Sequence, residues 1–409
     1  MTTLGRSSDI GDQFFTSKQR KSVSIRPEIQ MMNDQFLLDE SLIYLNHAAV
    51  SPWPLVTVHA VEKFARENLQ FGAAHYPDWV KSENELRRIL CLLINAPSSD
   101  DISLLKNTSE ALSTIAYGID WKSGDNVVTF RQEFPSNRIV WESLRQFGVE
   151  TRLVDLSATT DADNPEEKLM ACCDENTRLL STSSVQYATG FRVDLETIGR
   201  FCRQRDILFC VDAIQSLGAI PFDVQRNKAD FVVADGHKWM LGPEGLALLF
   251  VRPELRAKLK LHQFGWHMIS RPGDFDQVDW KPSDTATRFE CGSPNMLGIH
   301  ALKASLTLIQ EQGIETIFEK ILTNTAFLID LVESSGDGLS LLSNRNNSRR
   351  SGIVSFAVAG MDPLLLHQRL MRSGVICASR GGGIRLSPHF YTSRAKLEAA
   401  WDRVMEQVN

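Results

Sequence analysis

The sequence predicts an α/β protein in which a mainly parallel sheet is flanked by helices and followed by a smaller α+β domain. Three observations lead to this prediction. The chain has 409 residues, more than a single hydrophobic core usually sustains, so two domains are expected. Its middle part alternates short apolar segments with amphipathic stretches. After about residue 285 this alternation gives way to a long helical region and then to mixed strands and helices.

The apolar segments of the middle part are short enough for strands and are apolar along most of their length. They are "NVVTF" (126–130), "TRLVDL" (151–156), "TRLLSTSSV" (177–185), "ILFCVDA" (207–213), "DFVVAD" (230–235) and "LALLFV" (246–251). Stretches such as 137–147 and 194–206 place apolar residues three and four apart, which indicates helices. Apolar strands separated by helices are typical of parallel sheets covered on both faces, and ligands bind at the carboxyl ends of such strands.

The same pattern predicts the domain boundaries. Residues 1–30 are polar and are expected to form an N-terminal arm, and residues 31–285 form the large, ligand-binding α/β domain. Within that range, residues 31–50 are able to pack with the small domain. Residues 286–409 are expected to form the small α+β domain.

The net charge, the lengths of the apolar runs and the cysteine pattern restrict the partners and the location that we expect. A net charge of −6 and a pI near 5.9 give no electrostatic reason to expect nucleic acid or an acidic membrane surface. No apolar run has the length of a transmembrane helix. The seven cysteines form no CxxC pair, so neither a disulfide framework nor a bound metal is predicted, and a cytoplasmic protein is expected.

Polar residues gather where the predicted strands end. Lys238 follows the strand "DFVVAD", and Asp212 ends "ILFCVDA" three residues before Gln215. "KNTSEAL" (106–112) is a polar turn that opens a helix, whose first backbone N–H groups are free to hold an anion. Arg385 belongs to "GGGIRLSPHFY" in the second domain.

These residue types fit one cofactor. A lysine amine forms an imine with an aldehyde, a carboxylate keeps a ring nitrogen protonated, an amide stabilises a phenolate, and a helix N-terminus anchors a phosphate. Together these are the requirements of pyridoxal 5'-phosphate. Arg385 would then bind a substrate carboxylate through two parallel hydrogen bonds.

The segment "VDAIQSLGAIPFDVQRNKADFVVADGHKWMLGPEG" closely resembles the signature of the class V aminotransferases, which are fold type I pyridoxal-phosphate enzymes. That family includes cysteine desulfurases, isopenicillin-N epimerase-like proteins and several transaminases and lyases. The resemblance extends over most of the chain through "LNHAAVSP", "NTSEAL", "EFPSN", "SSVQYATGFRVDL", "RFECGSPN" and "IRLSPHFY".

The resemblance implies a role for each matching residue. Lys238 would carry the cofactor as a Schiff base, Asp212 would pair with the ring nitrogen, and Arg385 would hold the substrate carboxylate. Gln215 would contact the phenolic oxygen, and Gln186 would lie close to the ring. The residues implied to hold the phosphate are Thr108, Ser109, His237 and, across a homodimer interface, Ser293.

Three positions depart from the cysteine desulfurase pattern. Phe134 stands where desulfurases have a ring-stacking histidine, and a phenyl ring packs but transfers no proton. Desulfurases also carry a cysteine on a mobile loop, whereas Cys377 lies in the apolar run "GVICAS" and is expected to be packed in a strand. Asp235 replaces a serine near the phosphate, so its carboxylate is expected to point away, toward a backbone amide.

The expected reaction starts with removal of the Cα proton of a small amino-acid substrate, because Lys238 is placed to act as the base. Our first expectation is a class V aminotransferase-type enzyme. The alternatives are a carbon–sulfur lyase or cysteine desulfurase-like enzyme, an epimerase and, least favoured, a non-catalytic cofactor-binding protein. Arg380 is open to two interpretations, a site for a second substrate carboxylate or a structural salt bridge.

Overall fold

The protein is described by a computed structural model covering residues 34–156, 164–276 and 278–408. The arm expected at residues 1–30 therefore lies outside the described residues. None of the helices in the described part has the length and hydropathy needed to cross a membrane.

The large sheet has seven strands in the order β2-β8-β7-β6-β5-β3-β4. They are β2 (Ile102–Leu105), β3 (Asn126–Phe130), β4 (Glu150–Val154), β5 (Thr177–Ser183), β6 (Leu208–Asp212), β7 (Phe231–Asp235) and β8 (Ala247–Val251). Strand β8 is antiparallel to both of its neighbours, and the other pairs are parallel. The prediction of a mainly parallel sheet is thus confirmed.

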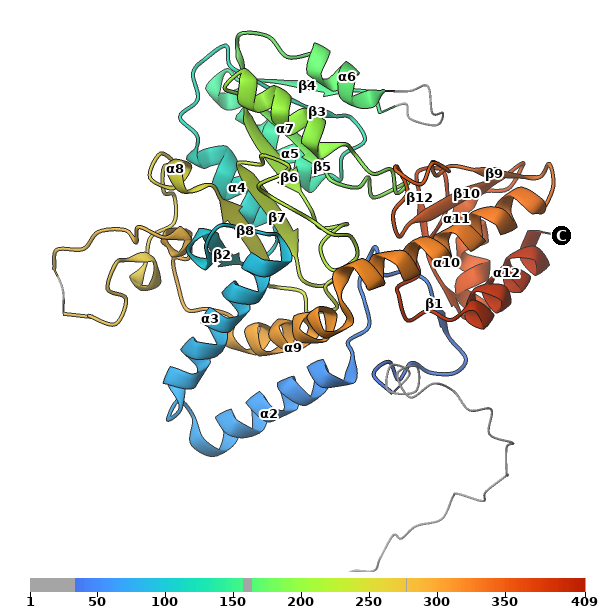
Figure 1. The fold of residues 1–409 in the computed structure, drawn as a ribbon, viewed down its shortest axis with the longest axis horizontal. Coiled ribbons are helices and arrows are strands. Elements are labelled where there is room, and N and C mark those ends of the chain that lie inside the picture. Colours follow the sequence, from blue (N-terminus) through green and yellow to red (C-terminus); the bar gives the residue numbers. More distant parts are fainter. Residues whose placement is uncertain (1–33, 157–163, 277, 409) are drawn as a thin grey trace, which may run out of the picture.

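Helices cover both faces of this sheet (Figure 1). They are α3 (Tyr76–Leu93), α4 (Thr108–Gly118), α5 (Ser136–Glu142), α6 (Pro165–Ala171), α7 (Leu195–Gln204), α8 (Pro253–Arg256) and α9 (Met296–Gln312), and α2 (Leu55–Phe71) packs on α9. One core cluster joins α4 and α5 to one set of alternating strand residues, and another joins α3, α7 and α9 to the opposite set. This arrangement explains why the central strands are apolar along their whole length.

The smaller sheet is antiparallel, in the order β12-β13-β10-β9, and packs with the last three helices (Figure 1). Its strands are β9 (Leu339–Leu341), β10 (Val354–Val358), β12 (Ala378–Arg380) and β13 (Gly383–Leu386). The helices are α10 (Ile314–Ser334), α11 (Pro363–Arg372) and α12 (Arg394–Val408). Strand β1 (Ile43–Tyr44) pairs in parallel with β11 (Val375–Ile376), so the chain near residue 43 lies on this domain.

Helix α9 contacts α2 and α3, on the side of the large sheet, whereas α10 contacts β9, β10 and α12. The chain thus runs from the large sheet to the smaller sheet through the consecutive helices α9 and α10. The boundary expected at residues 285 and 286 stays a prediction.

The carboxyl ends of β5, β6 and β7 lie side by side, because these three strands are parallel neighbours. Ser183 pairs with Asp212 in the register, and β7 ends at Asp235, three residues before Lys238. The sheet therefore brings together residues that are separated by more than fifty positions in the sequence.

Candidate active site

A pocket of about 320 Å³ lies at these strand ends and reaches the hairpin of β12 and β13. Its lining residues include Asn107, Thr108, Ser109, Phe134, Ser136, Tyr187, Asp212, Gln215, Asp235, His237, Lys238, Arg380 and Arg385. Most of the side chains predicted to form the site thus line one cavity. Gln186 and Ser293 are not among its lining residues.

Lys238 lies in the turn that follows β7, with 8% of its surface exposed. The Leu241 N–H donates to the Lys238 carbonyl over 3.0 Å and closes this turn. Burial lowers the pKa of the Lys238 ammonium, and the nearby carboxylate of Asp212 opposes that shift. The amine is thereby held closer to its neutral, nucleophilic form than a surface lysine would be.

Asp212 ends β6 and is 2% exposed. Its Oδ1 accepts the backbone N–H of Ile214 over 3.0 Å, which fixes the carboxyl group at the strand end. Burial raises the pKa of Asp212, and the charge of Glu133 adds to the shift while Lys238 opposes it. A buried carboxyl of this kind gains from a cationic partner, such as a protonated ring nitrogen.

The side-chain amide of Gln215 is held at both ends. Its Oε1 accepts the indole N–H of Trp239 over 2.8 Å, and its Nε2 donates to the Ala48 carbonyl over 3.0 Å. One N–H of this amide therefore remains available. The arrangement leaves Gln215 as a donor toward the pocket, as contact with a phenolate oxygen requires.

The N-terminus of α4 has the properties of an anion site. Asn107 caps the helix, because its side chain accepts the Glu110 N–H over 2.9 Å. Thr108 is buried, and its Oγ1 has no hydrogen-bond partner among the described residues. Ser109 donates its hydroxyl to Ser136 over 2.8 Å. An unpartnered buried hydroxyl at a helix N-terminus fits a phosphate oxygen.

Asp235 was expected to turn toward a backbone amide, but its Oδ1 lies 2.9 Å from Nδ1 of His237. The difference arises because His237 follows the end of β7 by two residues and folds back over that strand end. The carboxylate thus lies beside Nδ1, and Nε2 is the ring atom on the side away from this contact. The same contact keeps the Asp235 charge directed at the histidine.

Phe134 lies over the lysine, with its ring centroid 5.5 Å from Nζ of Lys238. The ring of Tyr187 meets it edge-on at 5.3 Å. Phe134 is 40% exposed at the pocket mouth, a place where a planar ligand ring would cover it.

Arg385 is 2% exposed on β13 and donates from Nη1 to the Tyr187 carbonyl over 2.7 Å. Its Nε is buried and has no partner among the described residues. Burial lowers the pKa of the guanidinium to about 10, with a further contribution from Arg380, so it stays charged at neutral pH. A buried guanidinium with free donors fits a carboxylate ligand.

Glu133 is a buried residue of this region that the sequence analysis did not identify. Its carboxylate accepts the Ser183 N–H over 2.9 Å, the Gln186 amide over 2.9 Å and the Asn137 amide over 3.1 Å. The Ser183 hydroxyl is a further, short donor. Gln186 is thus held against Glu133, and its own Oε1 is buried without a partner in the described part of the chain. The only signal in the sequence was a charged residue directly before Phe134.

Two other predicted positions lie apart from the pocket lining. Ser293 is exposed in the segment before α9, so a contact with the cofactor would have to come through a second copy of the chain. Cys377 is 2% exposed between β11 and β12, and burial raises the pKa of its thiol to about 12. Such a thiol is protonated at neutral pH.

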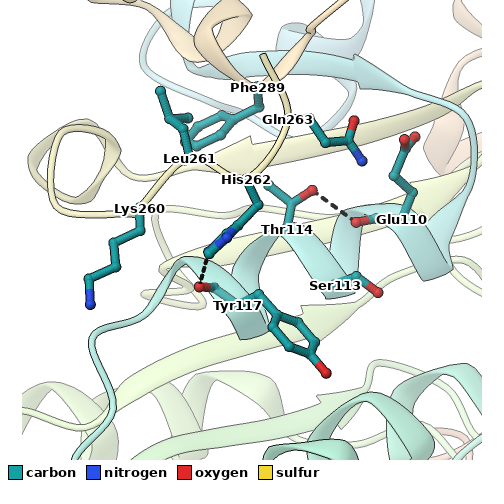
Figure 2. Close-up of a pocket in the computed structure, with 9 residues that line it drawn as sticks. All are labelled: Glu110, Ser113, Thr114, Tyr117, Lys260, Leu261, His262, Gln263 and Phe289. Carbon is teal, nitrogen blue, oxygen red and sulfur yellow. Dashed lines mark hydrogen bonds between the residues drawn. The ribbon is translucent and has the colours of Figure 1, made fainter.

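A second pocket, of about 240 Å³, lies along α4 (Figure 2). Its polar groups are already used by the protein itself: His262 donates to the Tyr117 carbonyl and Thr114 to the Glu110 carbonyl. Lys260 pairs with Asp120, and its side chain points away from the other labelled residues in Figure 2. The pocket of Lys238 is therefore the candidate active site.

Comparisons with known proteins identify the family of the chain. The sequence model of the aminotransferase class-V family matches residues 43–399 of this chain. A probable cysteine desulfurase of Methanothermobacter thermautotrophicus is 30% identical, with 94% of this chain and 98% of the relative covered. The uncharacterized aminotransferase YcbU of Bacillus subtilis is 27% identical, with 83% and 87% covered.

Solved structures show the same fold. The apo cysteine desulfurase from Thermococcus onnurineus matches with a TM-score of 0.82 at 23% identity, covering 95% of this chain and 99% of that one. The cystine C–S lyase C-DES, solved with its product cysteine persulfide, also gives 0.82 at 23% identity, covering 89% and 97%. The predicted fold class and the predicted cofactor, pyridoxal 5'-phosphate, are thus confirmed. The chain belongs to the class V aminotransferase family.

Proposed function

We propose that this enzyme is a pyridoxal-phosphate-dependent carbon–sulfur lyase that acts on cysteine or an S-substituted cysteine. The observation that carries the proposal is the pocket in which Lys238, Asp212 and Arg385 converge. The reaction type is supported by the relative named as a probable cysteine desulfurase, which this chain matches over nearly its whole length. The residues alone favour no single fate for the Cα carbanion, and the names of the relatives support elimination of sulfur over the other candidates.

Different pocket residues are proposed to bind different parts of the cofactor and the substrate. We propose that Thr108, Ser109 and His237 hold the phosphate, and that Asp212 pairs with the ring nitrogen. Gln215 donates to the phenolic oxygen, and Phe134 covers the ring. Arg385 binds the substrate α-carboxylate and so orients the Cα–H bond toward Lys238. When bound, the cofactor supplies an aldehyde that condenses with amines and a ring that accepts the electron pair released at Cα.

Lys238 then moves the proton. Its Nζ, whose pKa burial lowers, removes the proton from the substrate Cα. The Cα–H and Cβ–S bonds break, a Cα=Cβ double bond forms, and the sulfur leaves with the Cβ–S electron pair. Phe134 carries no exchangeable proton, so the protonated Lys238 is the group that returns a proton to the sulfur. The released enamine hydrolyses to pyruvate and ammonium.

The sulfur is proposed to leave as hydrogen sulfide from cysteine, and as a thiol or persulfide from S-substituted cysteines, rather than to be carried by the protein. No cysteine lines the pocket in the part of the chain that the structure describes. Cys377 is buried, and its raised pKa keeps the thiol protonated. β-Elimination needs no cysteine nucleophile. In a desulfurase, by contrast, a cysteine of the enzyme attacks the substrate sulfur and carries it away.

Transamination is the second candidate, because the family includes relatives named as aminotransferases, such as YcbU. The same lysine would return the proton to the cofactor carbon instead of to the leaving group. Epimerisation would need a proton donor on the opposite face of Cα, where Phe134 offers none.

The test is a product analysis of the purified holoenzyme with L-cysteine and L-cystine. We expect equimolar pyruvate and hydrogen sulfide from L-cysteine, equimolar pyruvate and cysteine persulfide from L-cystine, no bound sulfur on the protein, and no product with Lys238→Ala. Alanine together with protein-bound sulfur would instead indicate a desulfurase. A keto acid formed only in the presence of an amino acceptor would indicate a transaminase, and either result would overturn the lyase proposal.

We also propose a homodimer in the cytoplasm. Large apolar side chains are exposed in the segment that leads toward Ser293, among them Phe264 (62%), Phe275 (77%) and Trp280 (51%). Exposed apolar groups of this kind mark interaction surfaces. The seven cysteines are all free thiols, which supports a reducing compartment. Sedimentation equilibrium of the full chain at micromolar concentration tests the dimer, and a monomer would refute it.

A further inference from the structure

Two arginines leave the same face of one β-hairpin. Arg380 pairs with Gly383 in the register of β12 and β13, and Ala378 pairs with Arg385. Directly paired residues of an antiparallel ladder share a face, and so do residues two apart on one strand. Arg380 and Arg385 are therefore diagonal neighbours, a relationship that separates Cβ atoms by about 7–8 Å. Both line the pocket of Lys238.

Gly383, the residue paired with Arg380, carries no side chain. A Cβ atom at this position would lie 2.2 Å from the Phe356 carbonyl oxygen, so the backbone packing excludes any larger residue.

The charge of Arg380 is not matched by an acid. Its Nη1 donates to the carbonyl of the preceding residue, Ser379, over 2.7 Å, and no carboxylate of the described residues forms an ion pair with it. The acids that line the pocket are engaged elsewhere, since Asp235 contacts His237 and Asp212 lies beside Lys238. The structural salt bridge considered from the sequence is absent among the described residues.

The two guanidinium groups differ in depth. Arg385 is 2% exposed, whereas Arg380 is exposed beside it in the same pocket. A substrate whose α-carboxylate lies against Arg385 would therefore extend its side chain past Arg380 toward solvent. An anionic group at the end of that side chain would meet a free guanidinium.

We propose that Arg380 forms a second anion subsite, which selects amino acids whose side chain ends in a carboxylate. The inference rests on the proposed function for the identity of the leaving group. For the proposed carbon–sulfur lyase, the substrates are S-substituted cysteines in which the group attached to sulfur carries a carboxylate. This class includes cystine. The subsite acts on binding and leaves the bond-breaking step to Lys238.

The test separates this subsite from catalysis by using ligands without an amine. Glutarate carries two carboxylates, and its monoamide, glutaramate, has the same shape with one charge fewer. Calorimetric titration of the holoenzyme with each ligand gives the charge preference directly. We expect glutarate to bind about five to ten times more tightly than glutaramate, the effect of one solvent-accessible charge pair with good geometry.

Two variants complete the experiment. Arg380→Gln should bring the two affinities within about twofold of each other, and Arg372→Gln, an exposed arginine on α11 outside the pocket, should leave the preference unchanged. Equal binding of both ligands by the wild type, no binding of glutarate, or a preference that survives in Arg380→Gln would overturn the subsite. Because neither ligand reacts, the result is independent of whether the enzyme proves to be a lyase.

Discussion

Trp239 donates its indole N–H to the side-chain oxygen of Gln215 over 2.8 Å. Trp239 is the residue directly after Lys238, so the turn that presents the lysine also fixes the amide proposed to contact the cofactor. The two groups are therefore positioned by one buried element, and a change in the tryptophan should disturb both the stability of the site and its affinity for the cofactor.

Trp239→Phe should leave Oε1 of Gln215 buried without its donor. We expect a loss of about 1–3 kcal/mol in the free energy of unfolding and weaker binding of pyridoxal phosphate. Urea denaturation of the apoprotein and fluorescence titration with the cofactor measure the two effects. The control is Trp401→Phe, which removes an indole hydrogen bond to Ser335 in the small domain. An equal loss of cofactor affinity in both variants would contradict the prediction.

Lys238→Ala should abolish covalent retention of the cofactor. After treatment with borohydride, the mass of the wild-type protein should increase by one reduced cofactor, while the mass of the variant stays unchanged. The rate of product formation should fall at least about 10²–10⁴-fold, since this side chain is proposed as base and acid. Lys260→Ala, at an exposed lysine, is the control. Borohydride-fixed cofactor on Lys238→Ala would show that another amine holds it.

Glu133→Gln should change how stability depends on pH. Burial raises the pKa of Glu133 above its ordinary value of 4.5, so the folded state binds its proton more strongly than the unfolded state does. The stability contributed by this group is complete below pH 4.5 and is lost as the pH rises through the folded pKa. The unfolding free energy of the wild type, relative to the variant, should therefore decrease from pH 4.5 upward in the apoprotein. A difference that stays constant across this range would argue against the buried, perturbed carboxyl.

Cys377→Ser should retain the proposed lyase activity. The thiol is buried and its raised pKa, about 12, keeps it protonated, so it is not expected to attack sulfur. We expect rates of pyruvate formation within twofold of the wild type and a stability loss of about 1 kcal/mol. Coupled pyruvate detection and thermal unfolding check both values. If the variant lost its activity together with protein-bound sulfur, Cys377 would be a sulfur carrier after all.

The positions of the residues at the strand ends could be predicted from the sequence, because the apolar pattern locates the strands and the parallel topology locates their carboxyl ends. Asp212 and Lys238 each follow an apolar segment, and parallel neighbouring strands must end at the same edge of a sheet. Arg385 comes from the smaller sheet, so no local pattern placed it beside these strand ends, and its role was proposed from its residue type and from the family resemblance.

Contacts between distant parts of the chain were not accessible in this way. Nothing in the local pattern around Glu133 indicates that it meets Ser183 and Gln186 about fifty residues later. The pairing of Asp235 with His237 depends on side-chain geometry within a turn, and so does the absence of an acid beside Arg380. Such relationships follow from three-dimensional packing rather than from periodicity.

The segment that begins with β1 attaches to both parts of the molecule. Leu45 exchanges backbone hydrogen bonds with Ile376 and Ser387 of the small domain, whereas Ala48 accepts from Gln215 and Ser51 donates its backbone N–H to His237. The segment therefore bridges the small sheet and the lining of the candidate active site. Ser387 lies two positions from Arg385, so this short segment ties the chain beside the arginine to the backbone and side chains around Gln215 and His237.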